Sequence, residues 1–190
     1  GGGAMMDIGI HMLDMTLHLL GEPGVTAASA MTHAEFGPRG RGGSGFGISQ
    51  VENGAPFEVE DLATAFLRLD SGATMLLESS WAQWIPEDLC YVTLYGADGG
   101  ATIEWAGGPG NHRITVWTEV EGIPAELSPQ VGEDRGHAGA IAEFLQAVRS
   151  GDAAAHDGSL ALRRARVIDA TTESFVFEIT GNSSKISQFI

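Results

Sequence analysis

The chain has 190 residues, 43% of them hydrophobic and 18% charged, and its 25 acidic residues against 10 Lys and Arg give a formal net charge of −15 at pH 7. This length predicts one large domain or two small ones, with ample material for a hydrophobic core. A surface so acidic repels phosphate groups, so we expect neither nucleic acid nor an anionic membrane as a partner.

The first predicted element is a helix from about Ala4 to Leu20, ended by the glycine and proline that follow it. Four titratable residues recur in it at intervals of four, three and four: Asp7, His11, Asp14 and His18. At roughly 3.6 residues per turn, these spacings place all four on one stripe of the helix. The neighbouring residues are almost all apolar, which predicts a helix that is buried on its other sides. Buried titratable groups need partners or a wet cavity, and they are typical of active sites.

Strands are predicted for the middle of the chain. One covers residues 25–36, and two hairpins follow with turns at Ser71-Gly72 and Asp98-Gly99, then a further strand at residues 112–120. Such a run of hairpins indicates a largely antiparallel sheet. The single cysteine, Cys90, falls in an apolar strand, which excludes an internal disulfide and a zinc cluster built on cysteine.

The last third of the sequence has helical periodicity. One helix is predicted for residues 137–151 and a longer one for residues 156–179, with Asp157 as its N-cap, followed by a polar turn and a short terminal strand. We expect the sheet-facing side of the longer helix to contain Leu160, Ala161, Ala165, Ile168, Thr172 and Phe175. The fold class expected is therefore α+β, a large open, mostly antiparallel sheet with helices packed on one face.

The glycine-rich segment Gly40–Gly45 formally matches the G-x-G-x-x-G pattern of dinucleotide-binding loops. That fingerprint needs a helix immediately after it to hold the pyrophosphate, and no helical period follows here. We therefore expect no cofactor-binding residues in this chain and interpret the segment as a surface loop, able to act as a lid over a site.

Two tryptophans, Trp81 and Trp84, come at the end of a predicted strand. Aromatic side chains at such positions often line pockets for sugars or rings, and core packing is an equally good interpretation. We take both as candidate substrate-binding residues. Asp61 opens a strand, where its role is a turn or a cap.

The titratable stripe has the residue types that acid–base chemistry requires. Near neutral pH, the imidazole of His11 can take or give a proton, and a carboxylate one turn away can bind substrate hydroxyls or raise the basicity of the imidazole. The segment also resembles the signature that opens the second domain of the glucose–fructose oxidoreductase, inositol dehydrogenase and MocA family. The matching residues are Gly2, Gly3, Asp7, Gly9, His11, Asp14, Leu20, Gly21 and Pro23. The resemblance continues in residues 60–81 and 91–103 and in the paired C-terminal helices.

The resemblance implies a two-domain enzyme that transfers hydride between NAD or NADP and a hydroxyl-bearing carbon of a sugar or cyclitol. Residues 1–190 would be its substrate-binding, catalytic and oligomerisation domain, and the Rossmann domain that binds the cofactor is absent from this chain. By the same resemblance, His11 is the catalytic proton donor or acceptor, Asp7 contacts the substrate beside it, and Asp14 can also reach the substrate. The Glu-Lys-Pro motif of the family is missing too, so we expect this chain alone to be inactive.

The expected partners are a sugar or polyol substrate and a second copy of the chain, giving at least a dimer through an uncovered face of the sheet. Two alternatives remain open. The chain could be a non-catalytic sensor or scaffold of the same fold, or Asp7, His11 and Asp14 could bind a metal. No apolar run is long enough to cross a bilayer and no signal peptide is visible, so a cytoplasmic location is expected.

Overall fold

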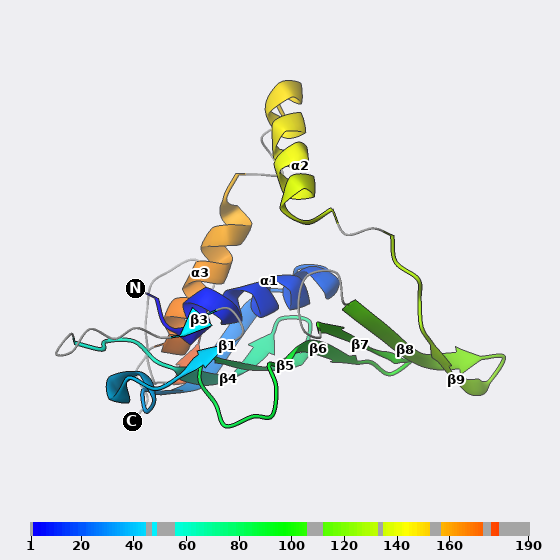
Figure 1. The fold of residues 1–190 in the computed structure, drawn as a ribbon. Coiled ribbons are helices and arrows are strands. Elements are labelled where there is room, and N and C mark those ends of the chain that lie inside the picture. Colours follow the sequence, from blue (N-terminus) through cyan, green and yellow to red (C-terminus); the bar gives the residue numbers. More distant parts are fainter. Residues whose placement is uncertain are drawn as a thin grey trace. The chain divides into compact units, whose positions relative to one another are not determined.

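The computed structural model describes residues 2–44, 47–48, 56–105, 112–132, 135–152, 157–172 and 176–178. The chain divides into two compact units, the first made of residues 1–86 and 161–190 and the second of residues 87–160. Each unit has a four-stranded antiparallel sheet (Figure 1). Among the described residues, no helix has the length and apolar character needed to span a bilayer.

The first unit is a sheet with two helices packed on it. A π-helical turn, η1 (Met5–Gly9), leads directly into helix α1 (Ile10–Leu19), and most of helix α3 (Ser159–Thr172) also belongs here. The strands β1 (Val25–His33), β4 (Leu62–Leu69), β5 (Thr74–Ser80) and β10 (Val176–Glu178) pair in the order β10-β1-β4-β5. A short 3₁₀ helix, η2 (Gly37–Arg39), and the two-stranded ribbon of β2 (Gly43–Ser44) and β3 (Gly47–Ile48) lie between β1 and β4 in the sequence.

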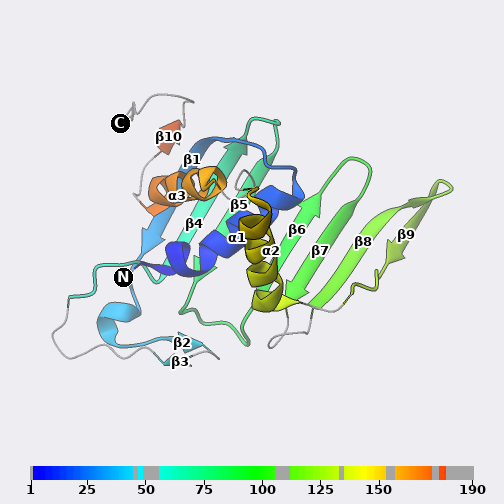
Figure 2. The ribbon, with the colours of Figure 1, turned by 90° about the horizontal axis from the view of Figure 1, so that it is seen from above.

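The core of the first unit lies between this sheet and its helices. Alternate residues of β4 and β5 point inward, because successive side chains in a strand face opposite sides of the sheet. Leu67 and Leu77 from the sheet join Leu13 from α1 and Ile168 from α3 in one buried cluster. Figures 1 and 2 show α1 and α3 on the same side of β1, β4 and β5. The helices therefore cover one face, and the other face carries the exposed side chains of Met31, Phe66 and Leu76.

The second unit is a meander of four strands followed by a helix. The strands β6 (Cys90–Tyr95), β7 (Gly100–Trp105), β8 (His112–Val120) and β9 (Ile123–Leu127) pair in chain order, and helix α2 (Gly136–Ser150) ends at Gly151. Two residues with positive φ, Glu121 and Gly122, join β8 to β9, as a tight hairpin turn requires. Cys90 is half-buried in β6, and burial raises the pKa of its thiol.

The α+β class expected from the sequence is confirmed, and several details differ. The strands form two four-stranded sheets instead of one large sheet. The last helix ends at Thr172, and residues 176–178, which the periodicity assigned to that helix, form β10 and pair with the edge of β1. Valine and phenylalanine favour strands, and an open strand edge offers them a hydrogen-bonding partner. The predicted terminal turn and strand lie outside the described residues.

Candidate functional site

The N-terminal end of the first helix is fixed by Glu60, which precedes β4. The backbone N–H of Met5 donates to Glu60 Oε1 at 2.9 Å, and that of Ala4 donates to the Glu60 carbonyl oxygen at 3.3 Å. The first N–H groups of a helix have no partner within the helix, and Glu60 accepts from two of them. A carboxylate at this end also interacts favourably with the helix dipole. A Cβ on Gly3 would lie 1.8 Å from Glu60 Oε2, so a side chain there would displace the carboxylate that Met5 N–H contacts.

The first helical turn is also held against strand β5. The hydroxyl of Ser79 donates to the carbonyl of Ala4 at 2.8 Å, and a Cβ on Gly9 would lie 3.2 Å from Ser79 Cβ. The N–H of Ile10 bonds back to the carbonyl of Met5, which makes this turn wider than an α-helical one. Single π-helical turns of this kind occur frequently at functional sites. The turn that carries Asp7 therefore lies on a rigid base.

Asp7, His11, Asp14 and His18 are all exposed on one side of this helix. The expectation that the other sides are buried is wrong: Met6, Leu19 and Leu20 are 52%, 44% and 39% exposed. The helix rests on the sheet through one side only, whose buried residues are Met5, Gly9, Leu13, Thr16 and Leu17. The side chains of Asp7 and His11 make no hydrogen bond or ion pair with any described residue, so both are open to a ligand.

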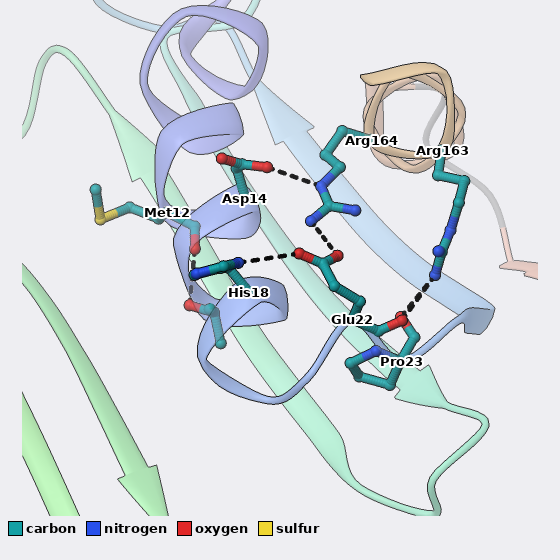
Figure 3. Close-up of polar contacts among 8 residues, drawn as sticks. Met12, Asp14, His18, Glu22, Pro23, Arg163 and Arg164 are labelled. Atoms are coloured by element: carbon teal, nitrogen blue, oxygen red, sulfur yellow. Dashed lines mark hydrogen bonds and ion pairs between the residues drawn. The ribbon is translucent and has the colours of Figure 1, made fainter. Parts of the chain in front are cut away.

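The second half of the stripe belongs to an ion-pair network with α3 (Figure 3). Arg164, only 3% exposed, donates from Nε to Asp14 Oδ1 at 2.8 Å and from Nη2 to Glu22 Oε2 at 2.5 Å. His18 Nδ1 lies 3.3 Å from Glu22 Oε1. Neighbouring Arg163 donates to the carbonyl oxygens of Glu22 and Pro23. Asp14, predicted to bind substrate, thus has a partner within the protein, while His11 and Asp7 have none in the described structure.

This network controls the ionisation of Glu22. The hydrogen bond from Arg164 is the main cause that lowers the pKa of the Glu22 carboxyl below its ordinary value of 4.5, and partial burial opposes it. The positive charge of Arg164 and the contact with His18 lower the pKa further. Glu22 therefore stays ionised and paired across the neutral range.

The role of Arg164 was not predicted from the sequence. The buried side of α3 consists of Arg164, Val167, Ile168 and Thr171. Of the residues expected to face the sheet, Ile168 is buried, whereas Leu160, Ala161 and Ala165 are exposed, and Phe175 lies outside the described residues. The helix is rotated because the aliphatic stem of an arginine can be buried when its guanidinium is paired. An arginine spaced three and four residues before Val167 and Ile168 was the available signal.

The two tryptophans have different surroundings. The ring of Trp81 packs at 5.9 Å from that of Phe57, and its Nε1 donates to the carbonyl of Glu60 at 3.3 Å. Trp84 is 87% exposed and contacts Phe36 edge to face. It borders an open pocket of about 430 Å³, which we call the Trp84 pocket and which is lined by Phe36, Arg41, Gly42, Ala82, Gln83 and Trp84. Trp81 is therefore a packing residue in this unit, and Trp84 is available for ligand contact.

Buried Asp61 organises the loop that reaches this pocket. Its Oδ2 accepts hydrogen bonds from the backbone N–H groups of Phe36 at 2.6 Å and Gly37 at 3.0 Å. Asp61 is therefore a cap for η2, one of the two roles expected from the sequence. In the described part of the Gly40–Gly45 segment no helix begins, and the segment enters the ribbon of β2 and β3. Gly45 itself lies outside the described residues.

No group of three or more His, Cys, Asp or Glu side chains in the described ranges is arranged to hold a metal ion. Asp14, one of the three ligands of the metal alternative, bonds instead to Arg164. The geometry gives the metal alternative no support. What the described part of the site offers is an exposed carboxylate and imidazole on a rigid turn, which suits substrate binding and proton transfer.

Comparison with known proteins identifies the family. Residues 1–102 match the model of the GFO/IDH/MocA C-terminal domain, which is more than half of the chain. The chain therefore belongs to this family, as its first 23 residues indicated. A model of the small subunit of acetolactate synthase also matches residues 160–190, a stretch too short to assign a family.

The relatives are sugar oxidoreductases. D-glucoside 3-dehydrogenase of Escherichia coli (strain K12) is 28% identical over 78% of this chain and 40% of its own length. A protein of Amycolatopsis mediterranei (strain S699), provisionally named as the oxidoreductase subunit of a UDP-kanosamine synthase, is 33% identical over 54% of this chain and 28% of its own length. The chain thus spans less than half the length of these curated relatives.

Solved structures share the fold. The aldose-aldose oxidoreductase from Caulobacter crescentus, complexed with glycerol, superposes with a TM-score of 0.68 at 21% identity, over 94% of this chain and 48% of that one. A levoglucosan dehydrogenase in complex with NADH and L-sorbose gives a TM-score of 0.66 at 16% identity, over 95% of this chain and 51% of that one.

Proposed function

We propose that this chain is the substrate-binding and catalytic half of an NAD(P)-dependent oxidoreductase acting on a hydroxyl-bearing carbon of a sugar or cyclitol. One observation carries the proposal: Asp7 and His11, in the D-x-G-x-H segment, lie exposed and unpaired among the described residues, on a turn fixed by Glu60 and Ser79. A purely structural role would not require both side chains to be exposed together at a turn that is held by hydrogen bonds.

The two side chains divide the work. His11 accepts the proton of the substrate hydroxyl during oxidation and returns it during reduction, and Asp7 binds the substrate and stabilises the protonated imidazole. When bound, a nicotinamide supplies the hydride chemistry. The described residues contain no strand–loop–helix unit with a glycine-rich phosphate loop, so we assign nucleotide binding to the part of the enzyme outside this chain. We accordingly expect calorimetric titration of the 190-residue chain with NADH or NADPH to give no micromolar binding.

We also propose that the enzyme is at least a dimer and that the uncovered sheet face of the first unit forms the interface. Met31, Phe66 and Leu76 are 54%, 42% and 83% exposed on this face, and Phe66 and Leu76 are directly paired across β4 and β5. Adjacent exposed apolar side chains on a flat sheet favour burial against a second copy.

Kinetics of the full-length enzyme test the proposed function. His11→Ala should lower kcat by about two to four orders of magnitude, the usual contribution of general acid–base catalysis, and leave the melting temperature unchanged because the side chain is exposed. His18→Ala, two turns further along the same side, is the matched control and should retain turnover. Near-normal turnover of His11→Ala would reject the proposed role of His11, whereas a wild-type enzyme that turns over no sugar or polyol would favour the scaffold alternative.

A further inference from the structure

The Trp84 pocket contains a cation, Arg41, that no described side chain neutralises. The loop between β1 and β4 contains Arg39 and Arg41. Arg39 is paired with Glu35, because its Nη2 lies 2.7 Å from Glu35 Oε2. Arg41 lines the pocket and has no side-chain partner among the described residues. In a chain with a net charge of −15, an unpaired arginine in a pocket is a local site for an anion.

The position of Arg41 is fixed by its backbone. Its N–H donates to the carbonyl of Phe36 at 3.0 Å, within the loop that Asp61 caps. The next residue, Gly42, has φ of +115°, and a Cβ there would lie 2.6 Å from the Trp81 ring and 2.8 Å from Ala82 Cβ. Only glycine allows the loop to approach the strand end so closely. The loop therefore brings Arg41 to the pocket through a specific backbone path.

The opposite wall offers an aromatic surface. Trp84 is 87% exposed, and its contact with Phe36 is edge to face, with ring centroids 5.9 Å apart and the planes at 64°. With this single edge-to-face contact and 87% exposure, at least one face of the Trp84 ring is free for stacking. Aromatic faces of this kind stack on nucleobases and on other flat or apolar ring surfaces.

We propose that the Trp84 pocket binds the phosphate-bearing part of a phosphorylated sugar, with Arg41 pairing with phosphate oxygens and Trp84 stacking on a ring of the same ligand. Planar guanidinium groups suit phosphate because they can donate two parallel hydrogen bonds. As a statement about the substrate, the inference rests on the proposed function, and it narrows the sugar to one that carries a phosphate or a diphosphate.

The pocket and the catalytic pair are linked through strand β5. Ser79, which contacts the first helical turn, precedes Trp84 by five residues. Five residues of extended chain span at most about 18 Å, so the Cα atoms of Ser79 and Trp84 lie within that distance of each other. The proposal places a phosphate-bearing arm in the pocket while the reacting carbon lies at His11.

Among the described residues, the acid Glu78 is bonded to the pocket lining. Gln83, a lining residue, donates from Nε2 to Glu78 Oε1 at 3.1 Å. Glu78 is exposed, so water and salt screen its charge. The carbonyl oxygen of Gln83 remains available to accept a hydrogen bond from a sugar hydroxyl.

Calorimetry on the 190-residue chain tests the proposal without cofactor or turnover, using glucose, glucose 1-phosphate, UDP-glucose and inorganic phosphate as probes. Both phosphorylated sugars should bind saturably and at least about tenfold more tightly than glucose. Arg41→Gln should weaken their binding by about tenfold or more, because it removes a charge-assisted contact. Arg39→Gln removes the same charge from the same loop and should change affinity by less than roughly twofold, since its pair with Glu35 is exposed.

The Trp84→Ala variant tests which ring of the ligand stacks on the tryptophan. The variant should fold, because the side chain is 87% exposed, and it should weaken binding by about fivefold or more. A loss larger for UDP-glucose than for glucose 1-phosphate assigns the stacking to the base, and equal losses assign it to the sugar.

Three results would overturn the inference: no saturable binding of either phosphorylated sugar, equal losses in Arg39→Gln and Arg41→Gln, or inorganic phosphate binding as tightly as glucose 1-phosphate and unaffected by Trp84→Ala. These results are separable from failure of the proposed function. A full-length enzyme that oxidises a neutral sugar with a rate dependent on His11, while the chain binds no phosphorylated sugar, keeps the proposed function and rejects the pocket.

Discussion

Arg164 on α3 and Asp14 on α1 form an ion pair across 150 residues of chain, with Nε and Oδ1 separated by 2.8 Å. The guanidinium is almost completely buried and also bonds to Glu22, while Asp14 remains 64% exposed. Arg164 Nη1 is buried with no hydrogen-bond partner in the described structure, so in that structure Asp14 and Glu22 neutralise the charge of the guanidinium. The pair therefore fixes the helix that carries the candidate catalytic residues to the C-terminal helix of the same unit.

Truncation of Arg164 should destabilise the protein. Arg164→Ala leaves the part-buried Glu22 without its arginine and opens a cavity under α3. We expect a loss of about 3 kcal/mol in the free energy of unfolding. This is the lower end of the range for a broken buried ion pair, because exposed Asp14 can rehydrate. Urea denaturation followed by circular dichroism measures it. Arg166→Ala, an exposed arginine of the same helix, should change stability by no more than about 0.5 kcal/mol, and equal losses in the two variants would contradict the role of the pair.

The same network makes stability depend on pH in a predictable direction. The pKa of Glu22 is lowered in the folded state from 4.5, first by the hydrogen bond from Arg164, so its contribution is fully present above the unfolded value and is lost as pH falls through the folded value. The stability difference between wild type and Glu22→Gln should therefore shrink between about pH 6 and pH 3. Thermal melts across this range test the sign, and a difference that grows on acidification would be inconsistent with the pairing.

The contribution of Asp61 to stability should come mainly from its Oδ2 atom. Asp61→Ala removes the acceptor of two buried or part-buried N–H groups, those of Phe36 and Gly37, and should cost about 2–4 kcal/mol. Asp61→Asn keeps a carbonyl oxygen for these donors and places its amide where Oδ1 has no hydrogen-bond partner among the described residues, so it should cost much less. Equal destabilisation by the two substitutions, measured by urea denaturation, would show that the charge and not the acceptor is required.

Turn chemistry and helix ends were predictable because they depend on local sequence. The hairpin turn at Ser71-Gly72 and the helix end at Gly151 are found in the structure, and the turn predicted at Asp98-Gly99 is centred one residue earlier, because Gly96 N–H bonds to the Gly99 carbonyl. Asp157, the predicted N-cap, lies two residues before the helix and accepts from the N–H of its first residue, Ser159, at 2.8 Å. That hydrogen bond also lowers the pKa of the Asp157 carboxyl.

Features that depend on distant contacts were not predictable in this way. The burial of Arg164 depends on Asp14 and Glu22, more than 140 positions away, so the periodicity of α3 alone could not show it. The division into two sheets depends on strand pairing, which the order of hairpins does not specify. The π-helical turn needs Ser79 packed against Gly9, a contact between segments far apart in the chain.

The proposed dimer interface should be sensitive to charge on the uncovered sheet face. Leu76→Glu places a carboxylate on an 83% exposed position next to Phe66, and we expect it to convert the dimer to monomer in light scattering at high protein concentration. The control is Val131→Glu, which adds the same charge at an exposed apolar position outside the strands and should leave the dimer intact. A wild-type chain that is monomeric at high concentration would contradict the interface.

Asp7 and Asp14 are chemically alike and lie on the same side of one helix, and the structure separates the effects expected of them. Asp14 has a partner in Arg164, whereas Asp7 has no partner among the described residues. In the full-length enzyme, Asp7→Asn should raise KM and lower kcat, each by about tenfold or more, because it removes the charge proposed to bind substrate and stabilise His11; the melting temperature should not change, because no described residue pairs with this carboxylate.

Asp14→Asn should lower stability and leave activity nearly unchanged. It weakens the ion pair, so the melting temperature should fall by a few degrees, as expected for a loss of about 1 kcal/mol in a domain of this size, while kcat/KM per folded molecule stays within roughly twofold. Steady-state kinetics and calorimetric melts on the two variants together decide between the roles. If Asp14→Asn also raised KM tenfold without a change in melting temperature, Asp14 would be a substrate ligand, as its place in the family signature suggests, and its bond to Arg164 would serve to orient it for that purpose.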